Sequence, residues 1–203
     1  MIDETALITA GVALFTICNP VGTLPVFLSV TEGMTVAKQR RVALMTGVGV
    51  FSVLAVSLVL GSLILQFFGI NVPSLKIAGF LFVSTIAWAM MTRSGSILPK
   101  QNDGDPAIVP LAMPVVAGPG AIALVIAFAK DNPALLDYLW GLLIVLVSAV
   151  ATAIIYFFGP YLAKALGPAG MDIFQKLFGL ILLAICVEQI LTAMPKIWPG
   201  LGG

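Results

Sequence analysis

Residues 16–25 read Thr-Ile-Cys-Asn-Pro-Val-Gly-Thr-Leu-Pro and interrupt an uncharged run that extends from Thr5 to Val30. Residues 110–120, Pro-Leu-Ala-Met-Pro-Val-Val-Ala-Gly-Pro-Gly, interrupt a second such run, from Ile108 to Ala129. Proline lacks the N–H that a helix needs and clashes with the preceding turn, while glycine loosens the helix. Each stretch therefore predicts a break inside a long apolar helix.

Both predicted breaks fall deep inside their runs. At about 1.5 Å per residue, Asn19 lies about 20 Å from the start of the first run, and Gly118 about 15 Å from the start of the second. The hydrocarbon layer of a membrane is about 30 Å thick, so both breaks lie near its middle. Backbone freed at this depth must be buried in protein or line a polar cavity.

The composition is typical of a chain that lives in lipid. Of 203 residues, 60% are hydrophobic and 9% are charged, whereas soluble domains carry about 25% charged residues. The apolar runs are continuous, which favours helices over the alternating strands of a barrel. Six runs predict transmembrane helices: Thr5–Val30, Val42–Phe68, Leu75–Met91, Ile108–Ala129, Leu139–Ala163 and Ile173–Ala193. With short connections between them, we predict one all-α membrane domain over residues 1–203.

Several classes of function are excluded by what the sequence lacks. It contains no histidine, which removes Ser-His-Asp and Cys-His catalysis and the usual zinc hydrolase sites. Its two cysteines, Cys18 and Cys186, cannot form a disulfide framework or a four-cysteine metal site. No phosphate-binding GxxxxGK[ST] motif occurs, and 10 basic against 9 acidic residues give no excess for nucleic acid. We expect no enzyme, no metal, no cofactor and no nucleic-acid partner.

The basic residues predict how the chain sits in an inner (plasma) membrane. One side of the predicted topology holds Lys38, Arg40, Arg41, Arg93, Lys100, Lys164 and Lys176, and the other holds Lys76, Lys130 and Lys196. Cytoplasmic loops carry the excess of Lys and Arg. The richer side is therefore expected in the cytoplasm, with both termini of this multi-pass chain outside.

The two halves of the chain, about 1–100 and 101–203, resemble each other. Lys76-Ile-Ala-Gly79 matches Lys176-Leu-Phe-Gly179, and Gly69 corresponds to Gly167. The prolines of the two breaks, Pro20 and Pro119, also correspond. Three spans are an odd number, so the second half must enter from the opposite face. The sequence therefore predicts two inverted three-helix repeats with broken helices one and four, a pattern common in transporters.

A broken helix presents two half-helix ends in the middle of the membrane. The N–H groups that follow Pro20 and Pro119 suit a carboxylate, and the carbonyls just before the breaks suit an ammonium group or Na⁺. The alternative is a pair of ordinary proline kinks, which transmembrane helices tolerate. We predict substrate binding by Cys18, Asn19, Pro20, Gly22, Thr23, Ala117, Gly118, Pro119 and Gly120.

Glu188 is the one acid well inside a predicted span. A charged carboxylate is expensive in hydrocarbon, so Glu188 should be protonated, paired or open to water. It is therefore a candidate for proton or cation coupling. The alternative is that it already lies at the outer interface.

The two break motifs also resemble a known family. Residues 19–31, Asn-Pro-Val-Gly-Thr-Leu-Pro-Val-Phe-Leu-Ser-Val-Thr, and residues 110–122 resemble the two motifs of the MarC, or SnatA-like, integral membrane proteins. The resemblance implies six helices in two inverted triplets, with discontinuous helices one and four, and a cation-coupled carrier of small neutral amino acids. One departure is Phe80, where the family's third helix usually reads Ala-Gly-Gly.

We therefore predict a secondary transporter of small neutral amino acids such as glycine or alanine, coupled to Na⁺ or H⁺. Its partners would be membrane lipid and a small zwitterionic solute, and its oligomeric state is left open. The alternatives are a channel or exporter-like pore for another small solute, and a structural or sensory membrane protein.

Overall fold

The computed structural model describes residues 4–92, 112 and 115–198. All regular structure in these ranges is helical. Among the described residues, four segments are long and apolar enough to cross a membrane: Leu7–Val30, Val36–Phe67, Val72–Thr92 and Leu135–Lys196. The all-α, multi-pass membrane fold is therefore confirmed, while the arrangement as two inverted three-helix repeats stays a prediction.

The first apolar run is divided where the sequence predicted a break. Helix α1 spans Glu4–Cys18 and helix α2 spans Pro20–Val30. The residue before a proline avoids the helical conformation, and proline itself fits the first position of a helix. The dipeptide Asn19-Pro20 therefore ends one helix and starts the next.

Helix α3, Val36–Phe67, begins before the predicted span because Thr35 caps it. The Thr35 side chain accepts a hydrogen bond from the N–H of Lys38 at 3.3 Å, which satisfies one of the N–H groups that a helix start leaves open. Helix α4, Val72–Thr92, follows after Gly69, whose φ of 62° lies in the left-handed region. Both helices agree with the second and third predicted spans.

Helix α5, Pro119–Asp131, is the second part of the predicted fourth span. Residues 108–111, 113 and 114 of that span lie outside the described residues. Helix α6, Leu135–Ala193, contains both the fifth and sixth predicted spans and is followed by the short helix η2, Met194–Lys196. The loop predicted between those two spans was wrong, because the chain is helical there on both sides of a single kink.

That kink lies at Gly167, with φ 64° and ψ 177°, immediately before Pro168. The proline has no N–H to continue the helix, and only glycine adopts this positive φ without strain. A straight helix of 59 residues would be about 90 Å long, several times the thickness of a membrane. The kink divides α6 into a first limb, 135–166, and a second limb, 168–193.

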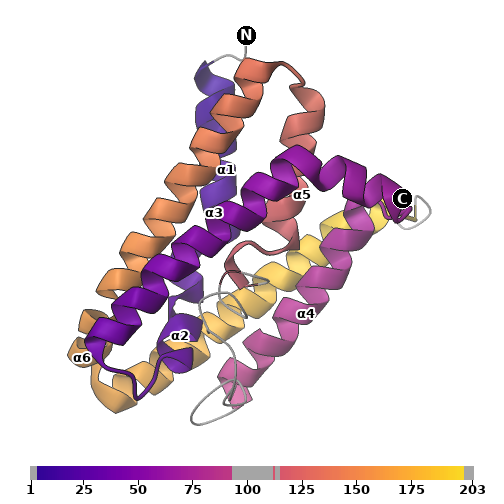
Figure 1. Cartoon of the computed structure of the whole chain (residues 1–203). Helices are drawn as coiled ribbons and strands as arrows, with labels where there is room; N and C mark the ends of the chain where they lie inside the picture. Colours follow the sequence, from indigo (N-terminus) through magenta and orange to yellow (C-terminus); the bar gives the residue numbers. More distant parts are fainter. Residues whose placement is uncertain (1–3, 93–111, 113–114, 199–203) are drawn as a thin grey trace.

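Helix α6 contacts every other described helix. It packs against α2, α3 and α4, and Figure 1 shows it turning back along the molecule at the lower left. Glycines allow close contact at these crossings: a Cβ on Gly47 would lie 2.7 Å from the Cβ of Ala153. Small residues at helix crossings are typical of membrane proteins.

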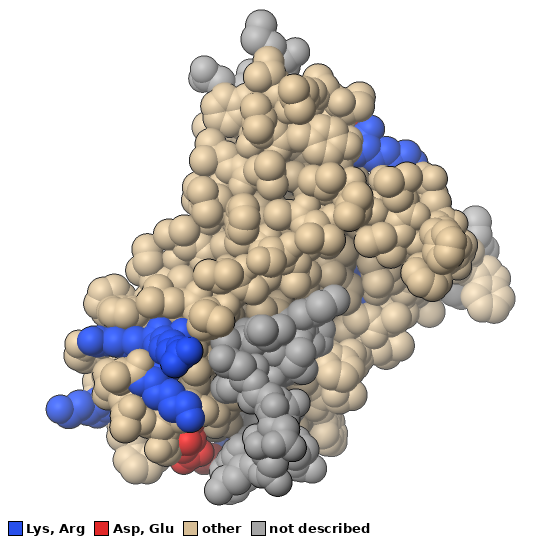
Figure 2. Space-filling view, in the orientation of Figure 1, with Lys and Arg blue, Asp and Glu red and all other residues tan. Residues whose placement is uncertain are grey.

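The outer surface matches a lipid environment. Many large apolar side chains are exposed, for example Phe67 at 83% and Val48 at 61%. Figure 2 shows a broad uncharged band across one face, with basic side chains gathered mainly at the lower left, where α3 begins, and at the upper right. Such a band is what the hydrocarbon layer requires.

Candidate functional site

The first break is organised by Asn19, which has φ 43° and ψ 56°. Asparagine is one of the few residues that enter the left-handed region readily. Its N–H donates to the carbonyl of Phe15 at 3.0 Å, and its own carbonyl accepts from the N–H of Thr23 at 3.0 Å. Its side-chain Oδ1 accepts from the N–H of Gly22 at 3.1 Å. Asn19 thus closes α1 and caps α2 at once.

Gly22 is required for that cap. A Cβ at Gly22 would lie 2.7 Å from the Cγ of Asn19, so any side chain would push the capping amide away. The bond between Gly22 and Asn19 also replaces the regular helical bond to the carbonyl of Cys18. Pro20 has no N–H to offer the carbonyl of Thr16. The end of α1 therefore presents carbonyl oxygens that suit a cation.

A buried polar chain supports this break from α6. Tyr156 is 0% exposed, and its hydroxyl donates to Oγ1 of Thr23 at 2.8 Å. Thr23 is 1% exposed and in turn donates to the carbonyl of Asn19 at 2.9 Å. The Tyr156 ring stacks on Phe27, with centroids 4.6 Å apart. Polar groups in hydrocarbon need partners. These two hydrogen bonds provide partners for the Tyr156 hydroxyl, the Thr23 hydroxyl and the Asn19 carbonyl at the break.

The second break has a different geometry. The N–H of Ala117 donates to the carbonyl of Ala112 at 2.9 Å, five residues back, as in a π-helical turn. Gly118 is extended, with φ −71° and ψ 173°, and no side chain caps α5 after it. The first helical bond of α5 runs from the N–H of Ile122 to the carbonyl of Gly118 at 3.0 Å. The amides of Gly120 and Ala121 precede that bond.

The two breaks meet around one small cavity of about 20 Å³. Five of the predicted site residues line it: Cys18, Asn19, Thr23, Gly118 and Gly120. The other four are buried beside it: Pro20, Gly22, Ala117 and Pro119. Water needs about 10–15 Å³ of such space, so the cavity has room for about one water and none for an amino acid. The structure therefore brings the predicted residues together in a closed state.

Helix α4 seals this cavity. Any side chain at Gly79 would overlap Pro119, so the glycine lets α4 pack directly on the second break. The ring of Phe80 lies against the other side of α5, with its Cζ 2.6 Å from where a Cβ on Gly120 would be. Phe80 also lines the cavity. The Phe80 ring thus occupies space between the two breaks.

The two helix starts differ in what they offer a ligand. The start of α2 already has the Asn19 side chain as its partner. The start of α5 has no side-chain cap, and its Gly120 and Ala121 line the cavity. A helix N-terminus attracts negative charge through its unpaired N–H groups and its dipole. The start of α5 is therefore the end that suits an anion.

Glu188 is not part of this constellation. Its side chain is exposed on the second limb of α6, two positions after the buried Cys186. It lines neither the cavity between the breaks nor the larger cavity described below. A coupling role for Glu188 stays a prediction.

Sequence reasoning missed the contribution of α6 to the site. Tyr156, whose hydroxyl donates to Thr23, lies on the first limb of α6. Leu182 and Ile185 lie on the second limb, and both line the cavity. Leu182 and Ile185 gave no signal, because they look like any apolar residue in a span. Tyr156 gave a weak one, since a tyrosine hydroxyl deep in a span needs a partner.

Comparison with known proteins agrees with these motifs. UPF0056 membrane protein YhcE of Escherichia coli K12 is 35% identical over 94% of this chain and 92% of its own length. UPF0056 membrane protein YvbG of Bacillus subtilis is 30% identical over 94% of each chain. UPF0056 inner membrane protein MarC of Escherichia coli SMS-3-5 is 30% identical over 97% of this chain and 98% of its own length. No solved structure matches the chain.

The family described as MarC family integral membrane protein matches residues 5–198. That range includes both helix breaks, the kink in α6 and every residue that lines the cavity between the breaks. The chain therefore belongs to the MarC family of integral membrane proteins.

Proposed function

We propose that the chain is a secondary transporter of small neutral amino acids such as glycine or alanine, with its substrate bound between the two helix breaks. The observation that carries this proposal is the meeting of both breaks around one cavity, with an uncapped helix start on one side. Discontinuous helices whose ends face a site at mid-membrane are typical of transporters.

The substrate carboxylate would bind the amides of Gly120 and Ala121 at the start of α5. This end has no side-chain cap, whereas Asn19 already occupies the start of α2. The ammonium group would face the carbonyls at the end of α1 and the Asn19 amide. Walls formed by Phe80 and Val83 leave room for only a small side chain once the cavity opens.

A six-crossing, inverted arrangement fits the described helices. The first limb and second limb of α6 would cross separately, and α5 would complete a crossing with residues before it. Gly69 and Gly167, which correspond in the sequence, adopt matching φ values of 62° and 64°. In Figure 1, α1 runs down towards its break, while α5 runs up from its own. Opposite directions of this kind support an inverted repeat.

The orientation belongs to the same proposal. The start of α3, with Lys38, Arg40 and Arg41, lies at the end of the molecule away from the N-terminus (Figure 1). We place this end in the cytoplasm and both termini outside, because cytoplasmic ends carry the excess of basic residues. Transport would then proceed by alternating access around the breaks, coupled to Na⁺ or H⁺.

Uptake of radiolabelled glycine and alanine into liposomes that hold the purified protein tests this proposal. A Na⁺ gradient and a pH gradient are imposed separately. We expect saturable uptake that follows one of them. Gly120→Leu and Pro20→Ala should reduce uptake far more than they reduce the yield of folded protein, because they alter the breaks. Ala78→Val, at an exposed position of α4, is the matched control and should transport normally.

The outcomes separate the alternatives. Flux without saturation or coupling would indicate a passive pore. No flux of either solute from folded protein would reject the amino-acid substrate. Normal transport by folded Gly120→Leu and Pro20→Ala variants would show that the breaks are not the binding site.

A further inference from the structure

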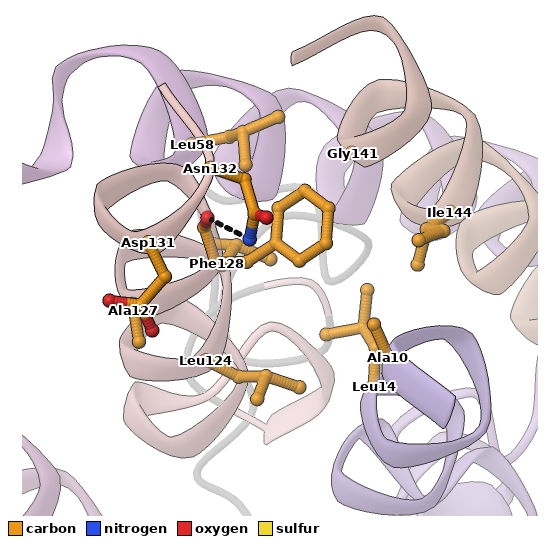
Figure 3. A pocket seen from close by; sticks show the side chains of 11 residues that line it. Ala10, Leu14, Leu58, Leu124, Ala127, Phe128, Asp131, Asn132, Gly141 and Ile144 are labelled. Carbon is orange, nitrogen blue, oxygen red and sulfur yellow. Dashed lines mark hydrogen bonds between the residues drawn. The ribbon is translucent and has the colours of Figure 1, made fainter. Parts of the chain in front are cut away.

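A second and larger cavity, of about 220 Å³, lies at the end of the molecule where α1 and α6 begin and α5 ends. Figure 3 shows its walls: Ala10 and Leu14 from α1, Leu124 and Phe128 from α5, and Ile144 from α6. Polar residues lie near the end of α5. Asn132 is held there by a hydrogen bond from its Nδ2 to the carbonyl of Phe128 at 3.0 Å. The cavity is about ten times larger than the one between the breaks.

This cavity extends towards the breaks. Ala10 is six residues after Glu4, the first residue of α1, and Cys18 is fourteen residues after it. At about 1.5 Å per residue these positions lie about 9 Å and about 21 Å along the helix. On α1 the cavity is lined from Ala10 to Leu14, which lies about 15 Å along the helix, so it ends about one helical turn before the level of Cys18.

The two cavities share two walls. On α1, Leu14 lines the larger cavity and Cys18, one turn further, lines the smaller one. On α5, Val125 lines the larger cavity and Ala121, one turn earlier, lines the smaller one. Residues four apart lie on the same face of a helix. The same faces of α1 and α5 thus run continuously from one cavity to the other.

Only apolar side chains divide the two spaces along these faces. Leu14 is 1% exposed and Val125 is 4% exposed, so both are packed shut. Neither carries a hydrogen-bonding group that would hold it in place. A change of rotamer or a small shift of α1 against α5 would join the cavities without breaking any polar contact.

We propose that the larger cavity is a water-filled vestibule on the N-terminal side of the membrane, through which a small zwitterionic solute reaches the breaks. Leu14 and Val125 form its gate. This inference rests on the proposed function for the nature of the solute. Water is the occupant we favour because Asp131 and Asn132 line the cavity near the end of α5 and give water polar partners there. The competing occupant is a lipid acyl chain, since most of the wall is apolar.

Thiol labelling from the N-terminal side separates water from lipid. Ala10→Cys lines the cavity, and Val12→Cys, 61% exposed on the outer face of α1, is the matched control. Both are made in a Cys18→Ala, Cys186→Ala background and treated with a charged, impermeant methanethiosulfonate. The thiolate, which forms in water, attacks the sulfur of such a reagent and displaces its sulfinate group, so we expect Ala10→Cys to react at least about tenfold faster than Val12→Cys. Equal rates would mean that the cavity is filled by lipid and would overturn the proposal.

The native Cys18 reports on the gate. In Cys186→Ala protein, Cys18 is 0% exposed and should react slowly. Leu14→Ala should raise its rate of labelling from the N-terminal side by at least about tenfold, because the thiol then meets water. Val125→Ala, on the opposite wall, should do the same if Leu14→Ala fails to fold. Leu54→Ala, in the core of α3 and outside both cavities, is the control for general loosening.

These readouts do not depend on transport. Fast labelling of Ala10→Cys and of Cys18 behind an opened gate would support the vestibule even in a protein that moves no glycine. In that case the proposed transport function would be rejected, while the proposed vestibule would stand. Unreactive Cys18 in folded Leu14→Ala and Val125→Ala variants would overturn the gate even in an active transporter.

Discussion

At the scale of single residues, Asn19 combines two properties that no other side chain supplies equally well. It tolerates a φ of 43° and its short amide caps α2. Left-handed backbone costs an ordinary residue about 1–2 kcal/mol, and a lost cap costs about 1 kcal/mol. Asn19 thus supplies both the left-handed backbone conformation of the break and the side-chain acceptor for the N–H of Gly22.

Two substitutions separate these contributions. Asn19→Gly keeps the left-handed backbone and loses the amide, so we expect a loss of a few tenths of a kcal/mol in unfolding free energy. Asn19→Ala loses the amide and strains the backbone, so it should cost about 2 kcal/mol. Thermal unfolding in detergent measures both. Equal stability of the two variants would contradict a left-handed Asn19.

Tyr156 and Thr23 form the other residue-scale unit. Tyr156→Phe and Thr23→Val each remove the hydrogen bond between their side chains, while the stacking of the ring on Phe27 remains. We expect Tyr156→Phe to cost about 1 kcal/mol and Thr23→Val to cost more, because Thr23→Val also removes the hydrogen bond to the carbonyl of Asn19. The double variant should cost less than the sum of the two, with a coupling of about 1 kcal/mol. A double-mutant cycle of unfolding free energies measures this coupling. Strictly additive losses would show that the bond contributes nothing.

At the scale of helices, glycine and proline decide where each element stops. Gly167 with Pro168 turns one long helix into two limbs, and its φ of 64° is open only to glycine without strain. Gly170, three residues later, has no positive φ and is the matched control.

Gly167→Ala should therefore destabilise the protein by about 1–2 kcal/mol, because alanine resists the left-handed region. Gly170→Ala should stay within about 1 kcal/mol of the parent protein, because the better helix propensity of alanine opposes a close contact of 3.1 Å between its Cβ and the Cβ of Leu166. Denaturation in detergent compares the two variants. Similar stabilities would argue against a kink at Gly167.

The helix breaks could be predicted because their cause is local. Proline without an N–H and glycine without a side chain act on their own turn, so Asn19-Pro20 and Gly118-Pro119 were readable from sequence alone. The link from Tyr156 to Thr23 joins residues 133 positions apart and depends on how α6 packs against α2. The predicted loop after Ala163 failed for another reason. Lys164 was assigned to that connection because of its charge, but helices also carry charges where they reach a membrane surface.

At the scale of the whole molecule, the apolar band and the basic end predict how the chain lies in the membrane. If each limb of α6 crosses once, position 165 near the kink faces the cytoplasm, and positions 133 and 198 face outside. All three residues, Pro133, Ala165 and Trp198, are exposed.

Single cysteines at these positions, in a Cys18→Ala, Cys186→Ala background, test that arrangement. In intact cells, Pro133→Cys and Trp198→Cys should react with an impermeant thiol reagent, while Ala165→Cys should react only after permeabilisation. The physical reason is the excess of basic residues on the cytoplasmic side. Labelling of Ala165→Cys in intact cells would reverse the orientation, and labelling of all three would reject separate crossings.

The all-helical, multi-pass membrane fold and the position of the breaks could be predicted from the sequence, because hydropathy and the Pro-Gly motifs are visible along the chain. The small size of the cavity between the breaks could not be predicted from the sequence. Whether Leu14, Phe80 and Val125 leave a passage depends on packing at the level of single side chains, which no pattern of apolar residues specifies.

For the proposed transporter, the cap that Asn19 places on α2 would have a consequence for its cycle. A carrier that releases its solute must return empty, and any helix end that held the solute then lacks a partner in a poorly hydrated place. The Asn19 side chain accepts a hydrogen bond from the N–H of Gly22 at 3.1 Å, so the start of α2 would keep its partner without solute. Only the start of α5 would have to be rehydrated on each return. The empty protein would thus resemble the loaded one at half of its site, which would lower the barrier to resetting.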